Sequence, residues 1–133
     1  MNAMISSACA LVGRLMLAFM FVYAGYGKVG RFDGTVANIG SKSLPVPEVL
    51  AAATIGLEVI AGVMLALGWK TRWAALALAV FTVIASVLFH NFWDMPVEQF
   101  RTQQLFFLKN MAAVGGLLMV VAFGAGRWSV DRR

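Results

Sequence analysis

Seven polar side chains that could do chemistry interrupt otherwise apolar stretches of this 133-residue sequence: Arg14, Lys28, Glu58, His90, Gln103, Lys109 and Asn110. Basic and amide side chains can donate hydrogen bonds to a carbonyl group or an anion, and a glutamate can carry a proton. No nucleophile with a neighbouring base and no phosphate-binding glycine loop accompanies them. The residue types therefore indicate ligand binding or proton handling, and they leave open whether the chain is itself an enzyme.

The surroundings of these polar residues are those of a membrane protein. Hydrophobic residues make up 61% of the chain and charged residues 13%, and the mean hydropathy is +0.81. A soluble core of this size cannot bury so much apolar surface, so a lipid bilayer is the expected solvent. The basic residues are scattered singly and form no stripe, which argues against a nucleic-acid partner.

Four stretches are long and apolar enough to cross a bilayer as helices, which takes about 20 residues. They are residues 5–27, 47–68, 73–92 and 103–124, and residues 28–46 are the longest connection. The first stretch lacks a basic leading region and contains Arg14, so we expect a membrane span there and not a cleaved signal peptide. We predict an all-α integral membrane four-helix bundle, a single domain over residues 1–133, with both termini on the same side.

Arg14 and Glu58 lie near the middle of the first and second predicted spans. A lone charge at that depth costs about 2.5 to 3.5 kcal/mol on insertion scales, and pairing offsets part of the cost. The guanidinium group of an arginine suits this role because its planar fork can hold a carboxylate with two hydrogen bonds. We therefore predict an Arg14–Glu58 ion pair, which could either fix the helix register or form part of a ligand or proton site.

Helical spacing predicts that the remaining polar residues converge. Lys28 shares a stripe of the first helix with Arg14 and Gly25, and Asn110 shares a face of the fourth helix with Gln103. Polar groups inside a bilayer face the bundle interior or a water-filled cavity. We expect a polar pocket that opens away from the termini, with the Arg14–Glu58 pair at its floor.

Two of the candidate ligand-binding residues have simpler interpretations. Lys109 has no acid at its depth, so it could reach up to the lipid headgroups, but an anionic or carbonyl-bearing ligand or a partner's carboxylate would explain it better. His90 could be a hydrogen-bonded structural residue, a proton carrier or, least of all, a metal ligand. No Cys, Asp or Glu stands at ligand spacing from His90, and Cys9 is the only cysteine, so no metal site is expected.

The lysine and arginine distribution bears on the orientation in the membrane. The predicted side with both termini holds five of these residues and the other side four: Lys70, Arg72, Arg127, Arg132 and Arg133 against Lys28, Arg31, Lys42 and Arg101. This difference favours termini in the cytoplasm.

The sequence resembles the DoxX family of small four-helix bacterial and archaeal membrane proteins. The resemblance rests on four segments that together cover residues 11–122: RLMLAFMFVYAGYGKV, LEVIAGVMLALGWKTR, LFHNFW and QLFFLKNMAAVGGLLM. It implies a four-helix bundle in the cytoplasmic (inner) membrane and a redox context, because members are associated with quinone-linked sulfur oxidation and with complexes that include detoxifying enzymes. It also points to a polar centre at Arg14, Lys28, Glu58, His90, Lys109 and Asn110. Related four-helix membrane families include thiol-redox proteins, but these use cysteine pairs, which this chain lacks.

Three functions follow as hypotheses. The leading one is an accessory or quinone-interacting subunit of a membrane redox complex, whose electron-carrying centres would belong to a partner because the chain has no flavin, haem or iron–sulfur motif. The second is a small-molecule or proton-coupled transporter with Glu58 as the titrating group, which would act as a homo-oligomer. Small multidrug exporters of similar size carry their acid in the first helix, where this chain has Arg14. The third is a non-catalytic membrane assembly protein.

Overall fold

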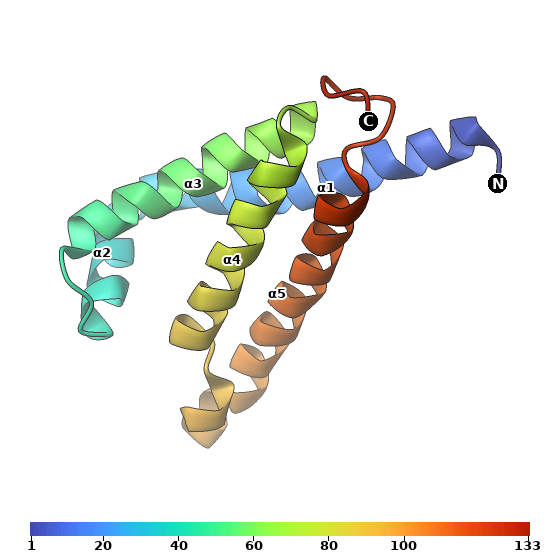
Figure 1. Ribbon diagram of the computed structural model, residues 1–133. Coiled ribbons are helices and arrows are strands. Elements are labelled where there is room, and N and C mark those ends of the chain that lie inside the picture. The colour runs from blue at the N-terminus through green and yellow to red at the C-terminus, as the bar shows by residue number, and fades with distance from the viewer.

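The computed structural model describes all residues 1–133, and it is helical throughout, with no strands (Figure 1). Its elements are α1 (Ala3–Gly30), α2 (Phe32–Ser41), α3 (Pro47–Leu67), α4 (Thr71–Phe89), the 3-10 helix η1 (Phe92–Asp94) and α5 (Val97–Phe123). Four of the helical segments are long and apolar enough to cross a membrane. The predicted fold class, a helical membrane bundle with four spans, is confirmed.

The ends of the long helices follow from local chemistry. The side chain of Asn2 caps α1 by accepting a hydrogen bond from the amide of Met4 at 2.7 Å. Pro47 begins α3, where the missing amide hydrogen costs nothing. Gly68 ends α3 in the left-handed conformation at φ 71°, which glycine adopts without strain. Gly68 therefore accounts for the sharp end of α3 before the short turn into α4.

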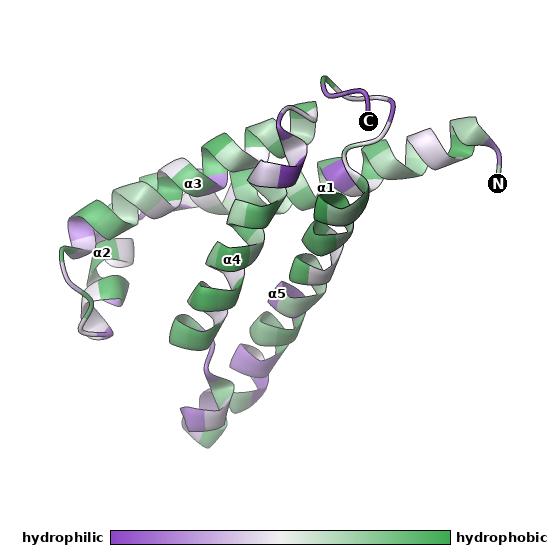
Figure 2. Cartoon of the chain, viewed as in Figure 1, coloured by the Kyte–Doolittle hydropathy of each residue, from purple (hydrophilic) through white to green (hydrophobic).

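The helices form two antiparallel pairs, α1 with α3 and α4 with α5. The pairs lie close together near the α3–α4 turn and spread apart toward their other ends (Figure 1). Figure 2 shows apolar residues along all four long helices and polar residues mainly at the loops and tail. The buried core lies where the pairs meet, and alanines make up half of it: Ala18, Phe21, Ala61, Leu65, Ala74, Ala75, Leu78, Ala79, Val114 and Leu117. Small side chains let membrane helices approach closely.

Two features differ from the sequence prediction. Residues 28–46, expected to be a connection, contain the end of α1 and the helix α2, since Phe32, Val36 and Ile39 recur at helical spacing and Ile39 is buried. The last long helix begins at Val97 and not near residue 103, because Pro96 provides a start and Glu98 favours the first turn. These polar first turns extend the fourth span beyond its apolar part.

Candidate ligand-binding site

A cavity of about 750 Å³ lies between the two helix pairs where they spread apart. Its walls come from α1, α2, α3, α4 and α5, all in the half of the molecule away from the termini (Figure 1). Six of the seven polar residues singled out in the sequence line it: Lys28, Glu58, His90, Gln103, Lys109 and Asn110. Its volume is in the range of small-molecule sites. We name this space the interhelical cavity.

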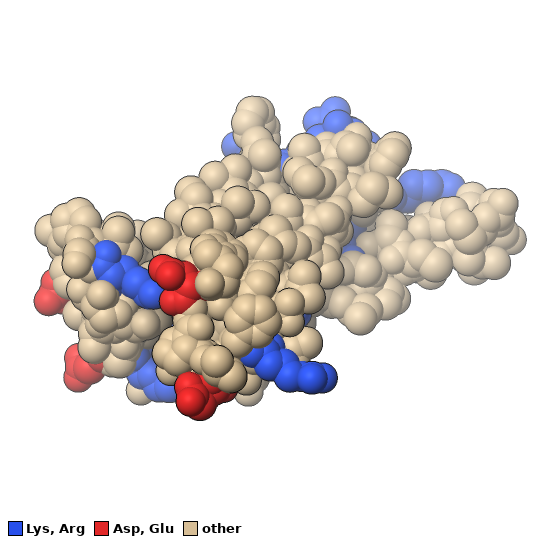
Figure 3. Space-filling model, turned by 90° about the horizontal axis from the view of Figure 1, so that it is seen from below, with Lys and Arg blue, Asp and Glu red and all other residues tan.

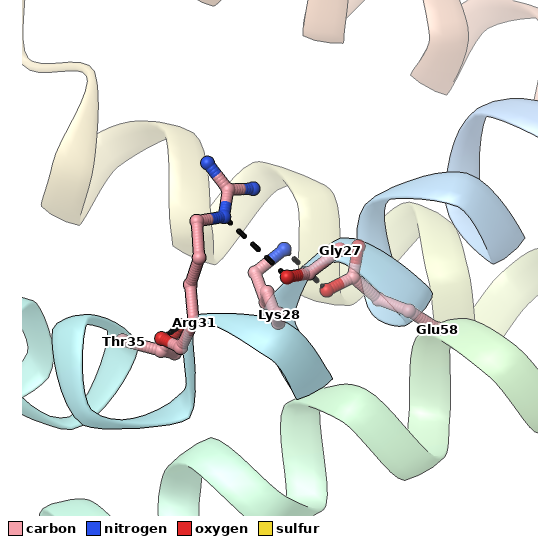
Figure 4. A network of polar contacts seen from close by, with 5 residues as sticks. All are labelled: Gly27, Lys28, Arg31, Thr35 and Glu58. Atoms are coloured by element: carbon pink, nitrogen blue, oxygen red, sulfur yellow. Dashed lines mark hydrogen bonds and ion pairs between the residues drawn. The ribbon is translucent and has the colours of Figure 1, made fainter.

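A short ion pair joins α1 to α3 in the wall of this cavity. The Nζ atom of Lys28 lies 2.7 Å from Oε1 of Glu58, and the two side chains are 30% and 4% exposed (Figure 4). The helices approach closely here because Gly25 has no side chain: a Cβ at that position would lie 3.1 Å from Cβ of Glu58. The carboxylate is therefore held in place at the cavity wall by Lys28.

The predicted Arg14–Glu58 pair does not form in the structure. Gly25 of α1, and not Arg14, lies opposite Glu58. Arg14 lies about 16 Å from Gly25 toward the N-terminus of α1, at about 1.5 Å per residue. The prediction assumed that the middles of the two spans lie at the same depth, whereas the first turns of α1 extend past the end of α3 (Figure 1). Arg14 therefore does not line the interhelical cavity.

Arg14 instead binds main-chain carbonyl groups at the terminal end of the protein. Its guanidinium nitrogens donate to the oxygens of Ala125 at 2.5 Å, Trp128 at 2.9 Å and Ala66 at 3.3 Å. These carbonyls belong to the last turn of α3 and to residues 124–133, which follow α5 and which we call the C-terminal tail. The arginine side chain is 3% exposed. It thus fastens the tail to α1 and α3.

Asp131 makes the second attachment of the C-terminal tail. Its carboxylate accepts hydrogen bonds from the amides of Lys70 and Thr71, both at 2.9 Å, and from the hydroxyl of Thr71 at 2.6 Å. It thereby caps α4, whose own N-cap residue provides no side-chain hydrogen bond. Hydrogen bonds from the side chain and then the backbone of Thr71 lower the pKa of Asp131. Sequence reasoning missed this contact, since no local signal near residue 131 identifies a partner sixty residues earlier.

The lowered pKa of Asp131 predicts a pH-dependent contribution to stability. This contribution is fully present above the unfolded-state pKa, near 3.8, and is lost as the pH falls through the lower folded-state value. We expect Asp131→Asn to lower the melting temperature at neutral pH, and the difference from the wild type to shrink as the pH falls below 3.8 and through the lower folded-state pKa. Thermal unfolding in detergent across this range checks it, with the exposed Glu98→Gln as control. A difference that persists at low pH would contradict the assignment.

Two hydrogen bonds fix the polar side chains of α4 and α5 at the cavity. Nδ1 of His90 lies 2.7 Å from Oε1 of Gln103, and Nε2 of the ring makes no hydrogen bond within the chain. Nδ2 of Asn110 donates to Oγ of Ser86 at 3.0 Å. Both bonds connect the two helices, and the oxygen of Asn110 keeps its capacity to accept.

Lys109 has no carboxylate within ion-pair distance, since the one ion pair of the structure joins Lys28 and Glu58. Its Nζ atom lies 5.7 Å from the centre of the Phe106 ring, and the residue lines the cavity. Arg31 is a further cation in the lining, and its Nε donates only to the carbonyl of Gly27 at 3.4 Å (Figure 4). Basic residues therefore outnumber acidic ones in the cavity.

Sequence reasoning missed the part of the lining that α2 provides. Arg31, Thr35 and Asn38 line the cavity, and the interpretation of residues 28–46 as a connection excluded them. The helical spacing of Phe32, Val36 and Ile39 was the available signal. Apolar wall residues include Phe21, Phe81, Phe89 and Phe106, so the cavity combines aromatic surfaces with hydrogen-bond donors. No three His, Cys, Asp or Glu side chains gather as a metal site would require.

Comparison with known proteins agrees with this architecture. The sequence model of the DoxX family matches residues 9–91. Inner membrane protein YphA of Escherichia coli is 32% identical over 123 residues, which cover 92% of this chain and 88% of YphA. Inner membrane protein YqjF of the same organism is 33% identical, with the same two coverages. The Surfeit locus protein 4 homolog of Schizosaccharomyces pombe is 30% identical, but the match covers only 36% of that protein. No solved structure matches. This chain is an integral membrane protein of the DoxX family.

Proposed function

We propose that this protein binds a membrane-soluble ligand with a carbonyl or anionic headgroup in the interhelical cavity, and that it serves as an accessory or quinone-interacting subunit of a membrane redox complex. The observation that carries the proposal is the cavity lining. Lys109 lines the cavity without a counter-ion. His90, at the end of α4, and Asn110, on α5, line the same cavity, and aromatic rings form much of its wall. Ligand sites typically combine apolar walls with a few placed polar groups.

The residues of the chain suit the parts of a quinone. Lys109 can donate a hydrogen bond to one carbonyl oxygen, and His90 or Asn110 can contact another polar edge of the headgroup. The rings of Phe81, Phe89 and Phe106 can pack against its plane. A bound quinone would accept electrons and protons, and the donor centres would belong to a partner subunit. Within this chain, the residues would bind and orient the headgroup.

The same proposal includes a location and an orientation. We place the protein in the cytoplasmic membrane of a bacterium or archaeon, because the relatives YphA and YqjF are inner membrane proteins. We place the termini in the cytoplasm, because the flanks at that end of the bundle hold five lysines and arginines against four at the other end. The interhelical cavity would then lie toward the outer half of the bilayer.

The test is binding of a short-chain ubiquinone analogue to the purified protein in lipid nanodiscs. We expect Lys109→Ala and His90→Ala each to weaken binding about tenfold, the effect of losing one hydrogen bond to a ligand oxygen. Lys109 makes no hydrogen bond in the structure, so its replacement should leave the melting temperature unchanged. Arg101→Ala is the control, because it removes a cation from the same helix outside the cavity. Wild-type affinity in both variants would contradict the proposal.

One observation supports a second function, a proton-coupled transporter. Glu58 is buried, can titrate and lines the same cavity, where protonation would remove its attraction for Lys28. The two functions differ in what Glu58→Gln should abolish. A transporter would lose pH-dependent uptake into proteoliposomes, whereas a quinone-binding subunit would retain part of its affinity through Lys109 and His90.

A further inference from the structure

A second cavity, of about 370 Å³, lies at the end of the protein that holds the termini. It is bounded by the first residues of α4 and by the C-terminal tail, and it shares no residue with the interhelical cavity. Its lining residues are Lys70, Thr71, Arg72, Trp73, Gly124, Asp131 and Arg133. We call it the basic pocket, because three of the seven carry a positive charge.

The cations of the basic pocket are not neutralised by ion pairs, and the one ring contact among them places Nζ of Lys70 5.3 Å from the centre of the Trp69 ring. Lys70, Arg72 and Arg133 form no ion pair, and their side chains donate no hydrogen bond. Both carboxylate oxygens of Asp131 are already bonded to the start of α4. The positive side-chain charge therefore exceeds the negative side-chain charge in this pocket, and an anion would complete it.

The charge distribution of the whole molecule supports the same conclusion. Asp131 is the only acidic residue at the terminal end, whereas Asp33, Glu48, Asp94 and Glu98 lie at the other end. In Figure 3 the visible acidic side chains accordingly gather away from the end where the termini lie. A membrane surface of anionic lipid would be attracted to the terminal end alone.

An apolar groove of about 540 Å³ adjoins the basic pocket. It runs between α1 and α5 and is lined by Met16, Leu17, Met20, Met119, Val120 and Phe123 among others. Gly124 lines both the groove and the basic pocket, so the two are neighbours. Trp69, Trp73 and Trp128 are partly or largely exposed at this end, as residues at a membrane–water interface are. The basic pocket and the apolar groove thus lie next to each other, as the headgroup and the acyl chain of a lipid do.

We propose that the terminal end binds an anionic phospholipid, with the phosphate on Lys70, Arg72 and Arg133 and an acyl chain along the groove between α1 and α5. Basic pockets between membrane helices suit anionic headgroups, and guanidinium groups hold phosphate oxygens with charge-assisted hydrogen bonds. Free phosphate could occupy the basic pocket as well, but it has no acyl chain to fill the adjoining groove. This assignment does not depend on any ligand of the interhelical cavity.

The experiment is native mass spectrometry of the full chain released from detergent, titrated separately with phosphatidylglycerol, phosphatidylcholine and inorganic phosphate. We expect phosphatidylglycerol to bind at least about tenfold more tightly than phosphatidylcholine. The double variant Lys70→Gln/Arg72→Gln should weaken phosphatidylglycerol binding about tenfold or more, because two charge-assisted hydrogen bonds are lost. Lys42→Gln/Arg101→Gln, with the same change of net charge at the opposite end, should bind like the wild type.

Three results would overturn the proposal. Equal binding of the two lipids would show that the headgroup charge is not recognised. An equal loss in the control variant would assign the effect to net charge and not to the basic pocket. Displacement of phosphatidylglycerol by inorganic phosphate at similar concentration would assign the pocket to free phosphate. Melting temperatures of both double variants near that of the wild type would show that any loss of binding is not a loss of folding.

Discussion

Lys28→Ala is expected to destabilise the protein by about 3 kcal/mol, because it leaves the carboxylate of Glu58 in the helix interface without its partner. The Glu58 side chain is 4% exposed, and its Oε1 lies 2.7 Å from Nζ of Lys28. Breaking a buried pair from one side costs about 3 to 5 kcal/mol, and the lower value applies here because Lys28 is 30% exposed. Equilibrium unfolding in mixed micelles measures the difference.

The control for this variant is Arg101→Ala, which removes an exposed cation with no hydrogen bond of its own in the structure. The free energy of unfolding of Lys28→Ala should be well below that of Arg101→Ala. Equal stability of the two variants would show that the Lys28–Glu58 contact contributes nothing. The double variant Lys28→Met/Glu58→Met should regain most of the lost stability, because neither charge then remains buried alone.

The same double variant separates structure from function at this pair. If the pair serves only to hold α1 against α3, a stable double variant keeps the ligand affinity of the wild type. If the pair is part of the interhelical site, the double variant folds but binds the quinone analogue more weakly. Stability and binding are therefore measured on one protein, and a purely structural role and a role in binding give opposite results for the Lys28–Glu58 pair.

The four spans and the convergence of polar residues could be predicted because both depend on local properties. Span length follows from the number of consecutive apolar residues. The location of His90 and Asn110 in one cavity follows from the cost of turning a polar side chain toward lipid. Neither inference needs the packing between helices. The residues that could face inward were therefore identifiable, although the partner of each one was not.

Which side chains pair across two helices depends on how far one helix is shifted along the other. The hydropathy of the sequence does not give this shift. The shift between α1 and α3 is set by close contacts at Gly25 and Gly62, where a Cβ would lie 2.8 Å and 2.7 Å from Val59 and Val22 side chains. Matching the span midpoints ignored these contacts. It paired Glu58 with Arg14, when the observed shift brings Lys28 to the carboxylate. Small residues on the facing stripes were the signal that could have corrected the shift.

Arg14→Met has the second large expected effect, and it tests that correction directly. The methionine keeps the apolar stem but removes the donors to the carbonyls of Ala66, Ala125 and Trp128. Hydrogen bonds to a charged group contribute about 1.5 to 3 kcal/mol each, so the two shorter bonds alone predict a loss of about 3 kcal/mol or more, or release of the C-terminal tail. Faster hydrogen exchange at Val130 and Asp131, whose amides bond to Leu67 and Gly68, would report that release.

A double-mutant cycle between Arg14 and Glu58 then decides between the two arrangements. In the structure these side chains share no partner, since Arg14 binds the tail and Glu58 binds Lys28. Separate sites contribute additively, so Arg14→Met and Glu58→Gln should together cost the sum of their single effects, within about 0.5 kcal/mol. A coupling well above that value would mean that the arginine and the glutamate meet after all, and it would contradict the observed register of α1 on α3. Additivity, together with release of the tail in Arg14→Met alone, would establish that Arg14 fastens the tail and does not pair with the buried acid.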